Sequence, residues 1–432
     1  MSYSTNALET GQGRQGRRKG TFAALRHKNF RYFWFGQCIS LMGTWMQRAA
    51  QIWLVYQITN SPFLLGLLGV AQSGPVMVFS LFAGAIVDRL PKRKLIITTQ
   101  IIMTFQAFAL AILTWSGKVQ YWHVLCLAAI LGVTQTLDMP GRQSFFIEMV
   151  GKEDLMNAIS LNSTIVNLAK VVGPTLAGIA METIGAGWCF FLNGVSFIAV
   201  IWGLFLIDVG NSAATSKRGN VLKDVSEGLR YILGNEVLRT TVLTLCIFAI
   251  FAMNTNVIAP VYVTDALGMG ASAYSNLMAA SGLGALIGAL YMATMASRED
   301  RVIKRYMLLR SAFACAAFHM TMIAVRSYPL ALLVVAAIGY VNLTFNNMAN
   351  SLLQINSDDD RRGRVMSVYT LVNNGTVPIG NMYVGLVMEK AGGAAGFFAC
   401  GLAIAVLMGL FVAWKPGAFF ERRSVTALSE EK

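Results

Sequence analysis

Long apolar segments recur along the whole of this chain, and they limit what it can fold into. Of its 432 residues, 55% are hydrophobic and only 13% are charged, whereas an ordinary soluble domain carries about 25% charged residues. A helix needs ~20 apolar residues to cross the ~30 Å of hydrocarbon in a bilayer. The sequence therefore predicts an all-α integral membrane protein. Its twelve transmembrane helices, spans 1 to 12, are expected at 30–57, 62–87, 95–116, 120–147, 155–183, 187–207, 238–264, 271–296, 303–325, 328–355, 364–389 and 393–414.

The positive charges fall in alternate connections between these spans. One set of connections holds the basic residues of 14–31, 92–94, 217–239, 298–305, 361–364 and 422–423, and the other holds only Lys118, Arg326 and Lys390. Basic loops of membrane proteins stay in the cytoplasm. We therefore expect both termini to be cytoplasmic, in a bacterial cytoplasmic (inner) membrane. The net charge of +14 then reflects topology, and no nucleic-acid partner is expected.

Several function classes find no support in the residues. The six cysteines stand singly without a CxxC pair, so we expect no disulfide framework, no metal and no other cofactor. The first apolar run starts after a long polar stretch and is too long for a cleavable signal peptide. No phosphate-binding Walker loop is present, which argues against self-contained ATP-driven transport. A membrane-embedded enzyme or a receptor remains only a remote alternative, because the spans offer little beyond Asp138 and His319 for catalysis.

The segment 80–94 carries a distinctive order of residues: a glycine in an apolar run, an Asp-Arg pair, a turn and a basic triplet. This order resembles the signature between the second and third helices of the major facilitator superfamily, although Pro91 stands where a second glycine is usual. The resemblance implies two pseudo-symmetric six-helix bundles. An acid at this place meets the positive end of a facing helix in one state only. The gating residues expected here are Gly84, Asp88, Arg89 and Arg93.

The chain divides near its midpoint, and its second part repeats its first. The longest polar connection contains an amphipathic stretch from Val221 to Leu238. The predicted units are a cytoplasmic tail and interfacial segment (1–29), a six-helix bundle (30–207), a cytoplasmic linker (208–237), a second six-helix bundle (238–414) and a cytoplasmic tail (415–432). A shift of 207 residues aligns Ser160 with Ser367, Asn167 with Asn374, Gly173 with Gly380, Gly178 with Gly385 and Glu182 with Glu389. Spans 5 and 11 are therefore predicted to be copies of one helix.

Span 5 contains a second motif, Gly173-Pro174 followed by Gly178. It resembles the antiporter signature of exporters in this superfamily, and it would let span 5 bend as a pivot for alternating access. The match is partial, because a glycine that often precedes the pair is absent at Ala169 and Lys170. The loop 358–367 and short segments of spans 1, 2 and 4 also resemble the subfamily that includes the enterobactin exporter.

Arg48 in span 1 and Lys170 in span 5 are bases with no acid on their own helices, and a buried charge is expensive unless it is paired or hydrated. We expect them to line a central cavity and attract an anionic solute, unless one of them neutralises an acid on a neighbouring span or extends to the interface. Amides complete the predicted substrate-binding set, although they are equally suited to joining helix to helix: Gln51, Asn167, Asn254, Asn346 and Asn374.

Asp138 stands one helical turn before Arg142 in span 4. It is the candidate proton-coupling acid, but its i,i+4 partner also suits a structural gate, for which Arg142 is the predicted second member. His319 titrates in a useful range, yet a lone histidine in an apolar helix is more often a packing residue.

These observations predict a secondary active transporter that exports an amphiphilic, siderophore-like or drug-like and possibly anionic molecule in exchange for protons. The expected partners are this small-molecule substrate, protons and membrane lipids, and the protein is expected to function as a monomer. A lysolipid flippase or an uptake facilitator on the same fold is the alternative.

Overall fold

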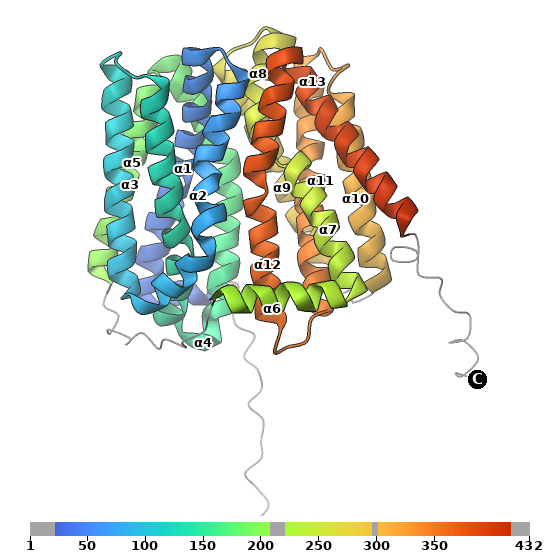
Figure 1. The fold of residues 1–432 in the computed structure, drawn as a ribbon. Helices are drawn as coiled ribbons and strands as arrows, with labels where there is room; N and C mark the ends of the chain where they lie inside the picture. The colour runs from blue at the N-terminus through green and yellow to red at the C-terminus, as the bar shows by residue number, and fades with distance from the viewer. Residues whose placement is uncertain (1–21, 208–220, 296–300, 416–432) are drawn as a thin grey trace, which may run out of the picture.

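The computed structural model describes residues 22–207, 221–295 and 301–415, and all regular structure within these ranges is helical. Long helices stand side by side in two bundles, and one amphipathic helix, α6 (Val221–Gly234), lies across one end of the second bundle (Figure 1). The first bundle contains α1 (Lys28–Thr59), α2 (Pro62–Arg89), α3 (Lys92–Trp115), α4 (Tyr121–Thr183) and α5 (Ala186–Leu206), preceded by the short 3-10 turn Ala23–Arg26.

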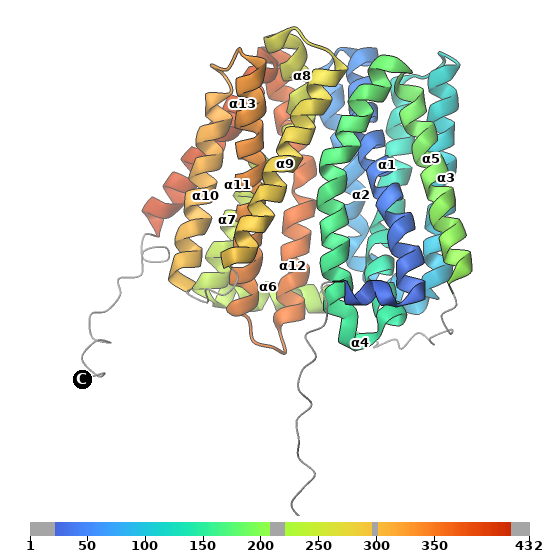
Figure 2. The ribbon, with the colours of Figure 1, turned by 180° about the vertical axis from the view of Figure 1, so that it is seen from behind.

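The second bundle contains α7 (Glu236–Ala252), α8 (Thr255–Leu267), α9 (Ala271–Met295), α10 (Arg301–Thr321), α11 (Tyr328–Ile355), α12 (Arg362–Gly375) and α13 (Val377–Trp414). The two bundles stand beside one another when the molecule is seen from behind as well (Figure 2). This arrangement confirms the predicted fold class of twelve transmembrane helices in two six-helix bundles.

The helices and the predicted spans do not correspond one to one. The segments α4 and α13 each hold parts of two spans. The helix is interrupted by a turn at Gly151 (φ 69°) in α4 and at Gly392 (φ 77°) in α13. Both dihedral angles lie in the left-handed region that glycine adopts readily. Conversely, span 7 is broken between α7 and α8, and span 11 is broken between α12 and α13 at Thr376.

Local sequence explains where several helices begin. Ser61 caps α2 by accepting a hydrogen bond from the backbone N–H of Leu64, and Pro62 follows in the first turn. Asn235 caps α7 by accepting from the backbone N–H groups of Val237 and Leu238. Such caps satisfy donors that have no partner within the helix.

The two ends of the bundles differ in chemistry and are named here for that reason. The basic end carries α6 and the turns at Pro91 and Gly151, and the far end carries the turns at Asn60 and Gly185. At the far end the two halves are tied together. The Glu389 carboxylate accepts hydrogen bonds from Ser61 Oγ and the backbone N–H of Phe63, each at 2.9 Å.

The repeat is visible in how the helices approach one another. A Cβ added to Gly132 would lie 2.6 Å from the Gln72 carbonyl of α2, and one added to its counterpart Gly339 would lie 2.0 Å from the Ser281 carbonyl of α9. Gly173 likewise packs against α1, and Gly380 packs against α7. Spans 4 and 5 therefore contact their neighbours through the same positions as spans 10 and 11, as a duplicated helix bundle requires.

Candidate transport site

Two cations share one tryptophan between α1 and α4. The Arg48 guanidinium carbon lies 5.2 Å from the centre of the Trp45 ring, and Lys170 Nζ lies 5.8 Å from the same centre. A cation over an indole face is stabilised by the ring quadrupole. The predicted pair of bases is therefore brought together, although the residues lie in different spans.

Neither base has an acidic partner among the described residues. Arg48 donates a hydrogen bond of 2.6 Å from Nη2 to the amide oxygen of Gln135 on α4. No carboxylate of the described residues forms an ion pair with Arg48 or Lys170. Two adjacent basic side chains without an acidic partner among the described residues suit a negatively charged group on a ligand.

The glycine-proline motif of span 5 lies immediately beside this cluster. A Cβ on Gly173 would lie 2.5 Å from Trp45 Cβ, and one on Gly178 would lie 2.8 Å from the Ser275 Cβ of α9. Pro174 is buried between them in α4. The motif therefore packs one side of span 5 against α1 of its own bundle and another against α9 of the opposite bundle. It lies at the junction where the two halves would have to move.

Polar side chains continue from this cluster toward the basic end. They form two equivalent stripes, one on α4 and one on α12, and most of their members are exposed: Ser160, Ser163, Asn167, Ser367, Thr370 and Asn374. Hydrocarbon does not solvate such groups, so polar faces of transmembrane helices look into protein or water. The two stripes are therefore suited to lining an aqueous path.

The remaining predicted amides are divided in their contacts. Gln51 is fully buried and joins three helices, since it accepts a hydrogen bond from Gln72 Nε2 at 3.2 Å and donates to the Val124 carbonyl. Asn254 and Asn346 each donate to a carbonyl four residues earlier. Their Oδ1 atoms are buried without a protein partner in the described structure. Gln51 therefore holds helices together, whereas Asn254 and Asn346 keep an acceptor available.

Asp138 and Arg142 form a buried ion pair in α4, with 2.5 Å between Oδ2 and Nε. The other Asp138 oxygen accepts hydrogen bonds from Thr99 Oγ1 at 2.6 Å and from Gln100 Nε2 at 3.3 Å. The Arg142 guanidinium also lies over the Phe33 ring at 5.7 Å. Asp138 thus connects α3 and α4, and both of its carboxylate oxygens accept hydrogen bonds.

The structure describes only part of the predicted gating segment 80–94, which is expected to act as a latch between two states. The backbone of Gly84 and Asp88 lies in α2, but the surroundings of these two residues fall outside what the structure describes. Arg89 is exposed. Arg93 donates to the carbonyls of Leu204 and Phe205 at 2.9 and 3.2 Å, at the end of α5. A cation at a helix C-terminus is favourable, so Arg93 joins α3 to α5 within the first bundle.

A buried amide network went unrecognised in the sequence. Gln47 donates to Gln106 Oε1 at 2.9 Å and accepts from Asn193 Nδ2 at 2.7 Å. It links α1, α3 and α5, and it directly precedes Arg48 in the chain. The polar residues are visible in the sequence, but their pairing depends on how three separate helices pack.

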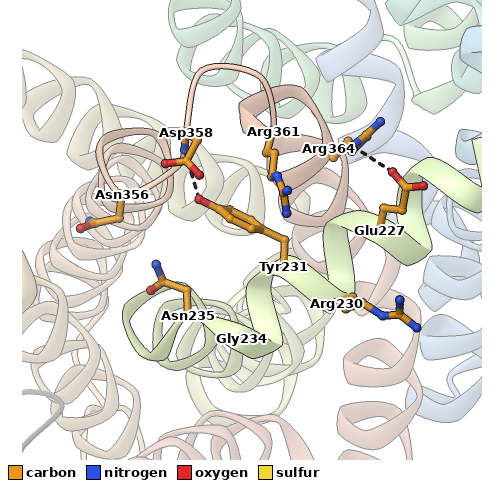
Figure 3. A pocket seen from close by; sticks show the side chains of 9 residues that line it. All are labelled: Glu227, Arg230, Tyr231, Gly234, Asn235, Asn356, Asp358, Arg361 and Arg364. Carbon is orange, nitrogen blue, oxygen red and sulfur yellow. Dashed lines mark hydrogen bonds and ion pairs between the residues drawn. The ribbon is translucent and has the colours of Figure 1, made fainter.

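The pocket at the basic end joins α6 to the α11–α12 loop (Figure 3). The Arg361 guanidinium lies over the Tyr231 ring at 5.0 Å, and the Asp358 backbone N–H donates to the Tyr231 hydroxyl at 3.2 Å. Arg364 pairs with Glu227 at 2.9 Å. These contacts fasten the linker helix to the start of span 11. No group of histidine, cysteine or acidic residues that could hold a metal ion occurs among the described residues.

The fold and these contacts define a multi-pass transporter built from two repeated bundles. A profile of the family described as "Transmembrane secretion effector" matches residues 19–428. The chain therefore belongs to this family of the major facilitator superfamily, and it is a transporter rather than an enzyme. Both the predicted superfamily and its exporter-like branch are confirmed.

Known relatives and solved structures agree with this assignment. The chain is 26% identical to the multidrug efflux pump Tap of Mycolicibacterium fortuitum, over 84% of this chain and 90% of Tap. It is 23% identical to the enterobactin exporter EntS of Shigella boydii, over 80% and 82% of the two chains. A POT family transporter in complex with 5-aminolevulinic acid has the same fold, with a TM-score of 0.72 at 12% identity over 93% of this chain and 99% of that one.

Proposed function

We propose that this protein exports anionic amphiphilic small molecules across a bacterial cytoplasmic membrane in exchange for protons. The basic end is then cytoplasmic, together with both termini, and a single chain is the working unit. The names of the relatives support export of drug-like or siderophore-like cargo. The preference for an anion is argued from this chain's own residues.

The observation that carries the proposal is the cluster of Trp45, Arg48 and Lys170. Its two cations lie on one aromatic ring and have no acidic partner among the described residues. A carboxylate or phosphate on the cargo would supply the missing counter-charge through charge-assisted hydrogen bonds. The apolar body of the cargo would contact aromatic and methionine side chains nearby, and methionine adapts to ligands of different shape.

The positions of the contacts between the halves support a mechanism of alternating access. The hydrogen bonds of Glu389, and the one between the Tyr56 hydroxyl and Asp265, close the far end. The polar stripes of α4 and α12 are exposed toward the basic end. We assign the close contacts of Gly173 and Gly178 to the pivot, and the Asp88 segment to a latch that forms in one state. Asn254, Asn346, Asn167 and Asn374 would then contact cargo along the path.

Two roles are proposed for Asp138. Its ion pair with Arg142 and its hydrogen bonds to α3 favour a gate that opens when the pair breaks. The same carboxylate is the candidate for carrying the exchanged proton, since protonation would release Arg142. In either role Asp138 and Arg142 act together.

The test uses the full chain in liposomes with an imposed pH gradient. We expect flux of fluorescent carboxylated amphiphiles that collapses when a protonophore is added. Flux that does not depend on the pH gradient would contradict proton exchange and favour a facilitator. Movement of labelled lysolipids alone would indicate a flippase instead.

A further inference from the structure

A groove lies on the outside of the second bundle, between α9 and α10. Both helices pack extensively against α11, but within the described residues they make almost no contact with each other. In the rear view α11 stands between them (Figure 2). The space has a volume of about 430 Å³, within the ~300–1,000 Å³ typical of small-ligand sites. It belongs to neither the Trp45 cluster nor the polar stripes.

The surroundings of the groove face lipid. Leu283, Ile287 and Leu290 form an exposed apolar stripe along α9, and Ile287 itself lines the groove. Phe313 and Tyr306 are exposed on α10. An apolar stripe of this kind on a membrane-spanning helix contacts acyl chains, so the groove is open to the bilayer.

The groove also contains an exposed arginine, Arg310. Arg310 forms no hydrogen bond and no ion pair with the described residues. Arg310 lies nine residues after the start of α10, which corresponds to ~13 Å of helix at 1.5 Å per residue. Side chains lean toward the N-terminus of their helix, and α10 begins at the basic end. The guanidinium therefore extends toward the headgroup level of that leaflet, where lipid phosphates lie within its reach.

The lining changes along the groove from polar to apolar. Toward the basic end Arg310 is accompanied by the Tyr291 and Tyr340 rings, whose centres are 6.0 Å apart, and by Thr344. Deeper in the bilayer the lining consists of residues such as Ala314, Phe318 and Ala337. This order matches an amphiphile whose charged head lies at the interface and whose chain extends inward.

We propose that this groove binds one anionic phospholipid of the leaflet at the basic end. The phosphate pairs with Arg310, and one acyl chain occupies the space between α9 and α10. The positive charge selects an anionic headgroup, and the groove selects for the attached chain. The lipid would fill the gap between these helices and so support the packing of the second bundle. This site is independent of the proposed export and of its direction.

The experiment measures lipid binding to delipidated full-length protein by native mass spectrometry. Phosphatidylglycerol, phosphatidylcholine and glycerol phosphate are titrated separately. We expect the first phosphatidylglycerol to bind roughly five- to tenfold more tightly than phosphatidylcholine, as one well-placed basic residue near anionic lipid predicts. Glycerol phosphate alone should not bind measurably. Equal binding of the two lipids, or binding of glycerol phosphate as tight as that of the lipid, would overturn the proposal.

Variants separate the two parts of the site. Arg310→Gln should reduce phosphatidylglycerol binding to the phosphatidylcholine level, while Arg310→Lys should retain most of it and shows that the fold tolerates a change at this position. Ala337→Phe, which fills the groove and keeps the charge, should weaken both lipids. Arg326→Gln removes an exposed charge outside the groove and should change nothing. Unaltered lipid selectivity in Arg310→Gln would contradict the assignment.

Discussion

Spans 4 and 5 and their repeats, spans 10 and 11, have the same backbone contacts but different chemistry. At a shift of 207 residues, Phe345 stands where the first half has Asp138, and Val377 stands where it has Lys170. Asp138 forms a buried ion pair. Phe345 instead stacks on Phe248 of α7, with ring centres 3.7 Å apart and planes inclined by 10°. At this position of the repeat, an ion pair stabilises the packing of the first half, and aromatic stacking stabilises the packing of the second.

The helix backbone differs at the same place. Residue Lys170 lies inside a continuous helix, whereas Val377 directly follows the break at Thr376 between α12 and α13. The glycines that permit close packing are shared by both halves. The charges at Asp138 and Lys170 have no charged counterpart in the second half, whereas Glu182 recurs as Glu389. This contrast suggests that the repeat supplies a common mechanical frame and that the first half adds recognition of an anion.

The largest effect is expected when the ion pair is broken. Asp138→Asn leaves Arg142 as a buried uncompensated charge, and one of its nitrogens already lacks a partner in the described structure. A loss of about 3–5 kcal/mol in the free energy of unfolding is expected. The counterpart Phe345→Leu should cost less, about 0.5–1.5 kcal/mol, because it loses the stacking on Phe248 but leaves no buried charge. Thermal unfolding in detergent measures both.

The double variant Asp138→Asn with Arg142→Gln is the control for this prediction. It removes both charges and should recover most of the lost stability. A single Asp138→Asn protein as stable as the unmodified chain would mean that the pair does not hold α4 in place.

A smaller effect is expected from the shared glycines. Gly380→Ala would place Cβ 1.9 Å from the Ile250 carbonyl, and Gly173→Ala would place it 2.5 Å from Trp45 Cβ. Each should cost about 1–3 kcal/mol, because two helices must move apart. Gly409→Ala in α13 meets nothing within 4 Å and is the matched control. If all three variants unfold alike, the close contacts are not essential to the repeat.

The smallest effect concerns the closed far end. Glu389→Gln weakens two hydrogen bonds to the start of α2 at an exposed site, which should cost about 0.5–1.5 kcal/mol. The repeat partner Glu182 is exposed, so Glu182→Gln should have no effect. The readout is the rate at which a membrane-impermeant maleimide labels Ser275→Cys, with the six native cysteines replaced by alanine. We expect faster labelling with Glu389→Gln alone, and equal rates in both variants would argue against a closure at Glu389.

The sequence predicted the number and class of the spans because apolar length is a local property. The shift of 207 residues also indicated which glycines pack alike. The breaks after Ala252 and Gly375 were not foreseen, because amides within a span are equally compatible with an unbroken helix. Asn254 and Asn256 follow the first break, and Asn374 and Pro378 flank the second. The gating role of Arg93 stays a prediction. Its contacts with the end of α5 could not be read from the sequence, because only tertiary packing defines this partner.

The candidate site was predictable as a pair of bases but not as a cluster. Arg48 and Lys170 stood out because neither has an acid on its own helix. Trp45 contacts both bases because α4 crosses α1 at Gly173. The periodicity of a sequence does not show where two helices cross. Gln51 was predicted to bind substrate, but its hydrogen bonds to α2 and α4 could not be told from a ligand contact.

The most direct test of anion recognition compares two cargoes of similar size, one carboxylated and one its neutral amide, in liposomes that contain Lys170→Gln or the unmodified protein. Removing a charge-assisted contact should lower carboxylate flux roughly tenfold and leave amide flux nearly unchanged. Arg48→Gln should behave in the same way, because both cations lie on Trp45. If both cargoes slowed equally in either variant, the two bases would be supporting the fold rather than selecting an anion.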